Sequence, residues 1–305
     1  RLEHTSPPHP LEAKFIDRAH NPTDRLSCYA EISGDLVVFV PEESRAHNQV
    51  IRKSAREVNV TIDPAMRKVS VELTPPTLDN PRGDFERLAE ELARTYGIDD
   101  VTIDVQVLRT LPRVLRAGDW RATVTLWQNR EIVLVEPGFV ESCYGLAVDI
   151  GTTTVAGFLC DLRTGRIAGT ASMMNPQVTY GEDVLSRLTY AVTNPDGFEQ
   201  LHRSIIDGLN GIIAKVAEEA GIAPDEILEA VFVANTVMHH ILLGIRPDAL
   251  GLAPYPPASH QSINLKGRDS GLAILPSGNV HVLPIEAGFV GADSVAVLIA
   301  EEPYK

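Results

Sequence analysis

The sequence predicts a chain of mixed α/β and α+β class, and two patterns lead to this prediction. Residues 146–150, 153–162 and 166–172 read as short β-strands joined by tight turns, which is the pattern of an antiparallel meander. Two helices are expected directly after them, at 180–192 and 197–220, because apolar residues recur there at helical spacing. Strands followed by helices favour a sheet with helices packed on it.

A smaller α+β unit is expected in the middle of the chain. Phe85, Leu88, Ala89 and Leu92 keep helical spacing, and Gly97 ends that helix. The flanking stretches have the composition of strands. The predicted elements are a strand at 66–73, helices at 85–93 and 105–117, and strands at 119–127 and 131–136.

The remaining elements are shorter. The C-terminal part predicts a buried strand at 230–234, a helix at 236–243, a strand at 280–284 and a helix at 289–300. Near the N-terminus, two β-rich runs on either side of Gly34-Asp35 predict a hairpin within 27–40.

The composition excludes several classes of protein. With 44% hydrophobic and 22% charged residues the chain is globular, and its 305 residues allow about two domains. The formal net charge of −14 disfavours a nucleic-acid partner, because an acidic surface repels phosphate backbones. No apolar run reaches about 18 residues, so neither a membrane-spanning helix nor a membrane partner is expected.

The three cysteines are Cys28, Cys143 and Cys160. Their odd number and wide spacing predict no disulfide framework. A reducing compartment fits them best, and we therefore expect the protein to be cytoplasmic. Taken without further context, each would be a small buried residue.

The strongest candidate for chemistry is the turn that follows the first strand of the meander. Gly151 allows the backbone to approach a phosphate, and the amides and hydroxyls of Thr152, Thr153 and Thr154 can donate to its oxygens. Asp149 is suited to hold hydrated Mg²⁺. The turn therefore predicts a site for ATP and Mg²⁺, although a plain hairpin with the same residues is an equal alternative. The P-loop pattern is absent from the sequence.

Two stretches strengthen the phosphate interpretation, because they resemble the actin-like ATPase superfamily. Residues 146–153 resemble its first phosphate loop, and residues 284–293 resemble its first connecting helix. The resemblance implies that 141–305 is the first half of an actin-like ATPase domain of ribonuclease H-like fold. It also implies that Glu286 orients the attacking water. Taken alone, Glu286 is better explained as an acid at a helix N-terminus.

Three further stretches, 144–166, 175–187 and 235–240, resemble the reductive activators of corrinoid proteins. The resemblance implies a [2Fe-2S] ferredoxin domain of β-grasp fold, a linker, a middle domain and the ATPase domain. Residues 25–38 resemble the end of that ferredoxin domain, so Cys28 is the expected cluster ligand. Asn235 and Thr236 are expected to contribute to the nucleotide site, together with the phosphate loop.

The domain boundaries expected from this resemblance are 1–42 for the ferredoxin remnant, 43–59 for the linker, 60–140 for the middle α+β domain and 141–305 for the ATPase half. A [2Fe-2S] cluster needs four thiolates, and only one of the expected ligands is present. We therefore expect the chain to be a fragment, in which the cluster forms only in the complete protein.

The expected function is ATP-dependent reductive activation, in which an electron passes from the [2Fe-2S] cluster to Co(II) of a corrinoid protein or corrinoid-dependent methyltransferase. A homodimer is compatible with this reading. Two alternatives stay open: a metabolite kinase on the same fold, and an iron–sulfur electron carrier whose second domain only docks a partner.

Two weaker candidates have simpler structural explanations. His239 and His240 are adjacent on an apolar helix and point about 100° apart, so a core or capping role is favoured over metal binding. Asp183 and Arg187 are spaced i, i+4, which is the spacing of an ion pair on one helix face. The resemblance of residues 175–187 to the family leaves a role in a cleft or between domains as the alternative.

Overall fold

The computed structural model describes residues 4–7, 30–38 and 61–301, and it divides the chain into two compact units, 1–50 and 51–305. In the first unit, Thr5 forms a β-bridge with Ile32, flanked by hydrogen bonds between 4–6 and 31–33. Residues 31–33 therefore pair with the start of the chain. The expected hairpin required pairing across Gly34, and no such pairing is present within residues 30–38. Cys28 lies outside the described residues.

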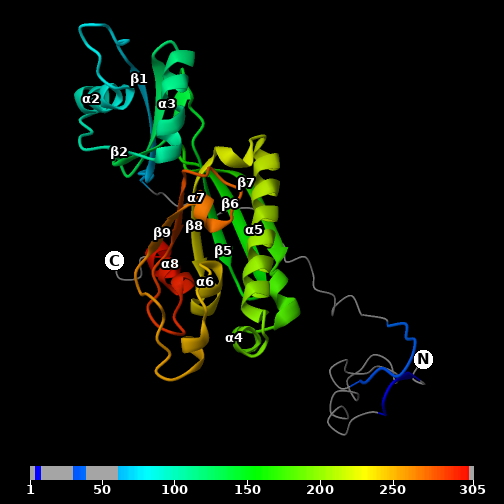
Figure 1. The fold of residues 1–305 in the computed structure, drawn as a ribbon. Coiled ribbons are helices and arrows are strands. Elements are labelled where there is room, and N and C mark those ends of the chain that lie inside the picture. Colours follow the sequence, from blue (N-terminus) through cyan, green and yellow to red (C-terminus); the bar gives the residue numbers. More distant parts are fainter. Residues whose placement is uncertain (1–3, 8–29, 39–60, 302–305) are drawn as a thin grey trace. The chain divides into compact units, whose positions relative to one another are not determined.

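The second unit begins with a four-stranded sheet of order β1-β3-β4-β2, accompanied by two helices (Figure 1). Its core contains Leu88 and Leu92 from one helix and Leu111 and Leu115 from the other, all fully buried against the sheet. The small α+β arrangement expected from the sequence is present. Its elements are β1 Met66–Glu72, α2 Asp84–Tyr96, β2 Thr102–Ile103, α3 Val105–Ala117, β3 Arg121–Trp127 and β4 Glu131–Pro137.

One boundary in this sheet differs from the expected one. The strand predicted from residue 119 begins at Arg121, because Asp119 and Trp120 have φ values of 50° and 64°. This left-handed backbone cannot continue into a strand. The turn that it forms is held by a hydrogen bond of 2.8 Å from the Leu73 amide to the Trp120 carbonyl.

The rest of the second unit is built on a six-stranded sheet of order β7-β6-β5-β8-β10-β9 (Figure 1). β5 pairs antiparallel with β6, and β6 pairs antiparallel with β7, which confirms the predicted meander. β8 then pairs parallel with β5, and β10 pairs parallel with β8. The strands are β5 Tyr144–Ile150, β6 Thr154–Asp161, β7 Arg166–Met174, β8 Ile227–Ala234, β9 Ile263–Lys266 and β10 Asn279–Val282.

The helices of this part follow the meander, but the first one is shorter than expected. The predicted helix at 180–192 begins only at Val184, as α4, Val184–Thr193, because Asp183 takes an extended conformation and caps it. A 3₁₀ turn, Pro176–Tyr180, precedes it. The long helix α5, Gly197–Ala220, ends at Gly221, whose φ of 68° terminates it as predicted. Two short helices, α6 Thr236–Leu242 and α7 Gly267–Ser270, and α8, Ala292–Glu301, complete this part. No helix among the described residues is long and apolar enough to cross a bilayer.

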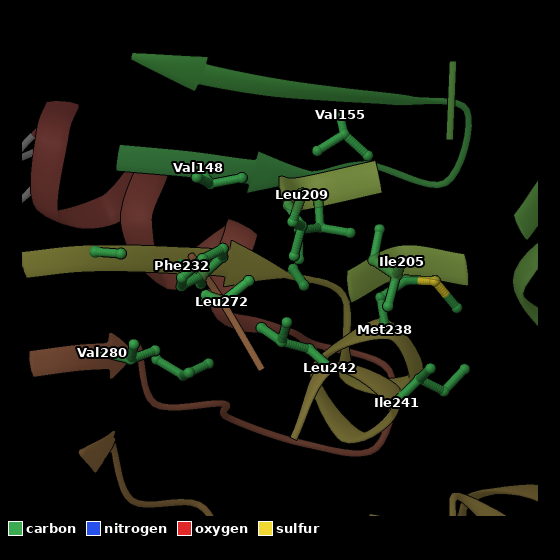
Figure 2. Close-up of a cluster of buried hydrophobic side chains, with 14 of the residues drawn as sticks. Val148, Val155, Ile205, Leu209, Phe232, Met238, Ile241, Leu242, Leu272 and Val280 are labelled. Carbon is green, nitrogen blue, oxygen red and sulfur yellow. The ribbon is translucent and has the colours of Figure 1, made fainter. Parts of the chain in front are cut away.

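One face of the six-stranded sheet forms the main hydrophobic core. Val148, Val155 and Phe232 project from three neighbouring strands toward Ile205 and Leu209 of α5 (Figure 2). Close packing needs a glycine in β6, because a Cβ at Gly157 would lie 2.6 Å from the Ile212 side chain of α5. Alternate residues of β5, Ala147 and Asp149, are exposed on the opposite face. The alternation therefore directs the Asp149 carboxylate away from the core.

The core position of Phe232 can be tested by truncation. Phe232 is 0% exposed, so Phe232→Ala should leave a cavity and lower the free energy of unfolding by about 3–5 kcal/mol, measured by urea denaturation. Phe158 is a matched control, because it lies on the opposite face of the same sheet and is only half-buried. Phe158→Ala should cost clearly less. Equal losses for the two variants would contradict the assignment of faces.

Candidate functional site

The turn between β5 and β6 has a backbone that only glycine can begin. The Gly151 amide donates to the Thr154 carbonyl at 3.0 Å, which closes the turn. A Cβ at Gly151 would lie 2.7 Å from that same carbonyl oxygen. Any larger residue would therefore push the turn open, and the backbone of Gly151 to Thr154 stays compact.

The carbonyl groups of this turn are held from one side. The Asn175 side-chain amide donates to the Gly151 carbonyl at 2.8 Å, and the Asn175 backbone amide donates to the Thr153 carbonyl at 2.8 Å. The carbonyl between them, that of Thr152, accepts a hydrogen bond from the Arg187 guanidinium. Three consecutive carbonyl oxygens are thus engaged by two buried side chains and one backbone amide.

The amide groups of the turn are available on the other side. Among the described residues, the N–H groups of Thr152 and Thr153 have no protein acceptor, and Thr153 is exposed. Consecutive amides that point into one space form a concavity that favours anions. The turn can therefore bind a phosphate oxygen at Thr152 and Thr153.

A second segment, the start of α6, contacts this turn. The side-chain oxygen of Asn235 accepts a hydrogen bond of 3.0 Å from the Met238 backbone amide and so caps the helix. The amide nitrogen of the same side chain lies 3.4 Å from the Thr152 hydroxyl. Asn235 therefore ties the β8–α6 connection to the β5–β6 turn.

A third segment, residues 286–293, packs on the second. The Thr236 hydroxyl donates to the Ala287 carbonyl at 2.8 Å. A Cβ at Gly291 would lie 2.5 Å from the Ala234 carbonyl oxygen, so glycine is needed for this approach. Glu286 is exposed in the turn before α8, and the helix begins only at Ala292. The expected place of Glu286 at a helix N-terminus is therefore wrong, and Asp293 occupies the first turn of α8 instead.

Two carboxylates meet at this junction. Partial burial raises the pKa of Asp149 above its usual value, and the nearby charge of Asp293 raises it further. Asp149 is nonetheless exposed on its strand, so the group opens to solvent. Two repelling carboxylates beside donor amides suit a hydrated divalent cation, which would relieve the repulsion. The residues present therefore fit Mg²⁺ bound together with a phosphate.

The two histidines of α6 lie in the core, as the sequence predicted. Both are 2% exposed. The His240 ring accepts from the Ala258 amide at 2.9 Å, and its other nitrogen lies 2.8 Å from the Thr236 carbonyl. Burial, with a smaller contribution from the neighbouring His240, lowers the pKa of His239 to about 4, so His239 is neutral at physiological pH.

The described cysteines do not fit an iron–sulfur cluster. Burial raises the pKa of Cys143 to about 11, and burial also raises the pKa of Cys160. A [2Fe-2S] cluster needs four thiolates, and the described residues contain only these two cysteines. No group of three or more His, Cys, Asp or Glu side chains within 61–301 and the shorter described stretches is placed to hold a metal ion.

Comparison with known proteins gives the chain its family. Residues 144–305 match the family model described as the RACo middle region, and residues 55–142 match the RACo linker region. The chain belongs to the reductive activators of corrinoid proteins. It is 33% identical over 276 residues to the corrinoid activation enzyme RamQ of Eubacterium limosum, covering 90% of this chain and 46% of that protein.

A solved structure in the same family has a similar fold. The chain matches a structure described as a reductive activator for corrinoid, iron–sulfur protein, with a TM-score of 0.74 and 31% sequence identity. The match covers 91% of this chain and 46% of that one. The chain thus spans about half the length of the relatives that it matches.

Sequence reasoning identified the β5–β6 turn but missed three residues that shape it. Asn175 and Arg187 lie in a stretch that resembles the family, yet no pattern assigned them contacts with the turn. Asp293 had no signal of its own. Their roles depend on contacts that are formed only when distant segments come together.

The raised pKa of Asp149, which burial causes first and the charge of Asp293 second, has a testable effect on stability. A carboxyl group whose pKa is raised in the folded state destabilises the fold when it is ionised, above its unfolded pKa. Asp149→Asn should therefore raise the unfolding temperature at pH 7 without metal or nucleotide, measured by calorimetry. The gain should disappear below about pH 3, where carboxyl groups are protonated.

The exposed Asp207 on α5 provides the control for this measurement. Asp207→Asn removes one negative charge elsewhere and should leave the unfolding temperature nearly unchanged. An unfolding temperature for Asp149→Asn at or below that of the unsubstituted protein at pH 7 would contradict a raised pKa of Asp149.

Proposed function

We propose that the intact protein is an ATP-dependent reductive activator of a corrinoid protein. The observation that carries this proposal is the meeting of three distant segments at one anion-accepting turn: Gly151 to Thr154, Asn235–Thr236 and residues 286–293. The family relationship supports the same conclusion, because both relatives are described as corrinoid activators.

We assign the parts of the chain as follows. Residues 141–305 are the first half of an actin-like ATPase domain of ribonuclease H-like fold, supported by the antiparallel meander with β8 added parallel to β5. Residues 60–140, which lie within the match to the RACo linker region, are a separate small α+β domain. Residues 43–59 connect it to residues 1–42, the end of a β-grasp ferredoxin domain.

In this proposal the phosphates of ATP bind at the β5–β6 turn. The amides of Thr152 and Thr153 and the hydroxyls of the turn donate to them, and Asp149 holds the hydrated Mg²⁺. Asn235 positions the Thr152 hydroxyl, and Thr236 holds the backbone of the 286–291 turn. Glu286, exposed in that turn, orients the attacking water. Bound Mg²⁺·ATP supplies the free energy that makes an uphill reduction possible.

The electron donor in this proposal is a [2Fe-2S] cluster with Cys28 as one of its four ligands. Reduction of Co(II) by such a donor is unfavourable, so it must be coupled to the nucleotide site. Moving an equilibrium from 1:99 to 99:1 requires about 5.5 kcal/mol of differential binding. A nucleotide that binds tightly to one conformation and weakly to the other can supply a free energy of this size.

The partner is a corrinoid protein or a corrinoid-dependent methyltransferase, and we place the reaction in the cytoplasm. Cys143 and Cys160 are free thiols, which is compatible with a reducing compartment. The negative charge of the chain makes nucleic acid an unsuitable partner. We include a homodimer as the working assembly of the intact protein.

The nucleotide part of the proposal is tested by Asp149→Asn in the intact protein. The variant keeps the shape of the side chain but removes the charge that holds Mg²⁺, so ATP hydrolysis should fall at least about tenfold, or about 1.4 kcal/mol of transition-state stabilisation. ATP-stimulated corrinoid reduction should be lost with it. The visible absorbance of the cluster should be unchanged. Hydrolysis at the original rate would disprove the role of Asp149.

The redox part is tested by Cys28→Ala in the intact protein. Loss of one of four thiolates should abolish the [2Fe-2S] absorbance and corrinoid reduction, while ATP hydrolysis continues. Cys160→Ala is the matched control and should keep the full spectrum. A complete cluster spectrum in Cys28→Ala would remove Cys28 as a ligand. A normal spectrum in a protein that binds no ATP would favour a simple electron carrier.

A further inference from the structure

Arg187 is fully buried, although the five residues before it, 182–186, are exposed or half-buried. Its side chain is 0% exposed and reaches from α4 to the back of the β5–β6 turn. The guanidinium donates to the Thr152 carbonyl and, at 2.9 Å, to the Gly181 carbonyl. A third nitrogen lies 3.4 Å from the Gln177 side-chain oxygen and 3.3 Å from the Met238 sulfur.

Among the described residues no carboxylate forms an ion pair with Arg187, although the charge of Asp183 acts on it from a greater distance. The expected ion pair with Asp183 is therefore absent; Asp183 is exposed and accepts the Ser186 amide at 2.8 Å. Burial lowers the pKa of Arg187 to about 10, and it remains charged at neutral pH. A buried, unpaired charge destabilises a protein, so its presence here calls for a compensating role.

The geometry of the peptide bond provides that role. In a trans peptide the carbonyl of one residue and the N–H of the next point in opposite directions. Holding the Thr152 carbonyl against Arg187 therefore directs the Thr153 amide to the opposite side of the turn. The Asn175 hydrogen bond to the Gly151 carbonyl directs the Thr152 amide in the same way.

We propose that Arg187 is a positioning residue for phosphate binding, which orients the Thr153 amide toward the bound anion and places a positive charge behind the turn. This inference rests on the proposed nucleotide function. The charge also offsets the two carboxylates, Asp149 and Asp293, which would otherwise repel the phosphates.

The test uses Arg187→Met and Arg187→Lys in the intact protein. Methionine keeps much of the length and apolar volume but removes all donors and the charge. Lysine keeps the charge but cannot reproduce the planar fork of the guanidinium. Arg203→Met is the matched control, because Arg203 is an exposed arginine on α5. The readouts are KM and kcat for ATP hydrolysis, and the affinities for ATP and for adenosine by calorimetry.

We expect Arg187→Met to raise KM for ATP by about tenfold or more with a smaller change in kcat. Affinity for adenosine, which has no phosphate, should stay within about twofold, and Arg187→Lys should restore part of the loss. Arg203→Met should behave like the unchanged protein. A merely structural role would weaken adenosine and ATP equally, and that result would overturn the proposal.

Three further outcomes are decisive. A folded Arg187→Met with an unchanged KM for ATP would overturn the role of Arg187 and leave the proposed function intact. Where Arg187→Met does not fold, Arg187→Lys decides. A raised KM for ATP with unchanged affinity for adenosine supports the proposal, whereas an unchanged KM or an equal loss for both ligands overturns it. If the protein without any substitution neither binds nor hydrolyses ATP, that result refutes the proposed function itself.

Discussion

The parallel pairing of β5, β8 and β10 is the constraint on which the candidate site depends. Ile150 pairs with Ala234, and both are the last residues of their strands, so the segments that follow them emerge side by side. β10 is aligned with β8 in the same direction, so the chain after Val282 leaves from the same edge of the sheet. Carboxyl ends of parallel strands are common ligand sites because the connecting loops converge there. A change of register in these pairs would separate all three segments.

The electrostatics of the site follow from what surrounds this edge. The front of the turn carries the carboxylates of Asp149 and Asp293, while the buried guanidinium of Arg187 lies behind it. Such an arrangement is unsatisfied in the free protein, because the carboxylates repel each other and the guanidinium has only neutral acceptors. A metal-bound anion would satisfy both. Stability without ligand and affinity for ligand are therefore expected to oppose each other at Asp149.

Much of the fold could be predicted from local pattern. The meander, the long helix ended by Gly221 and the strand ending at Ala234 each have periodicity or end signals within one segment. The predicted helix at 180–192 was wrong at its start, because Asp183 caps a new helix. β9 and α7 were missed, since each has four residues and depends on neighbours for its pairing or packing.

The sequence by itself determined the meander, the Asp149 to Thr154 turn and the family, because these depend on residues that are neighbours along the chain. Only the tertiary structure decided how the turn is held. Asn175 reaches it from the start of the 3₁₀ turn, Arg187 from α4 and Asp293 from α8, and these elements are brought together by the packing of α4 on α5 and of α8 on β8. The i, i+4 spacing predicted an ion pair between Asp183 and Arg187. The fold instead buries the arginine against backbone carbonyls, because those carbonyls lie within reach only after the 3₁₀ turn and the β5–β6 turn have come together.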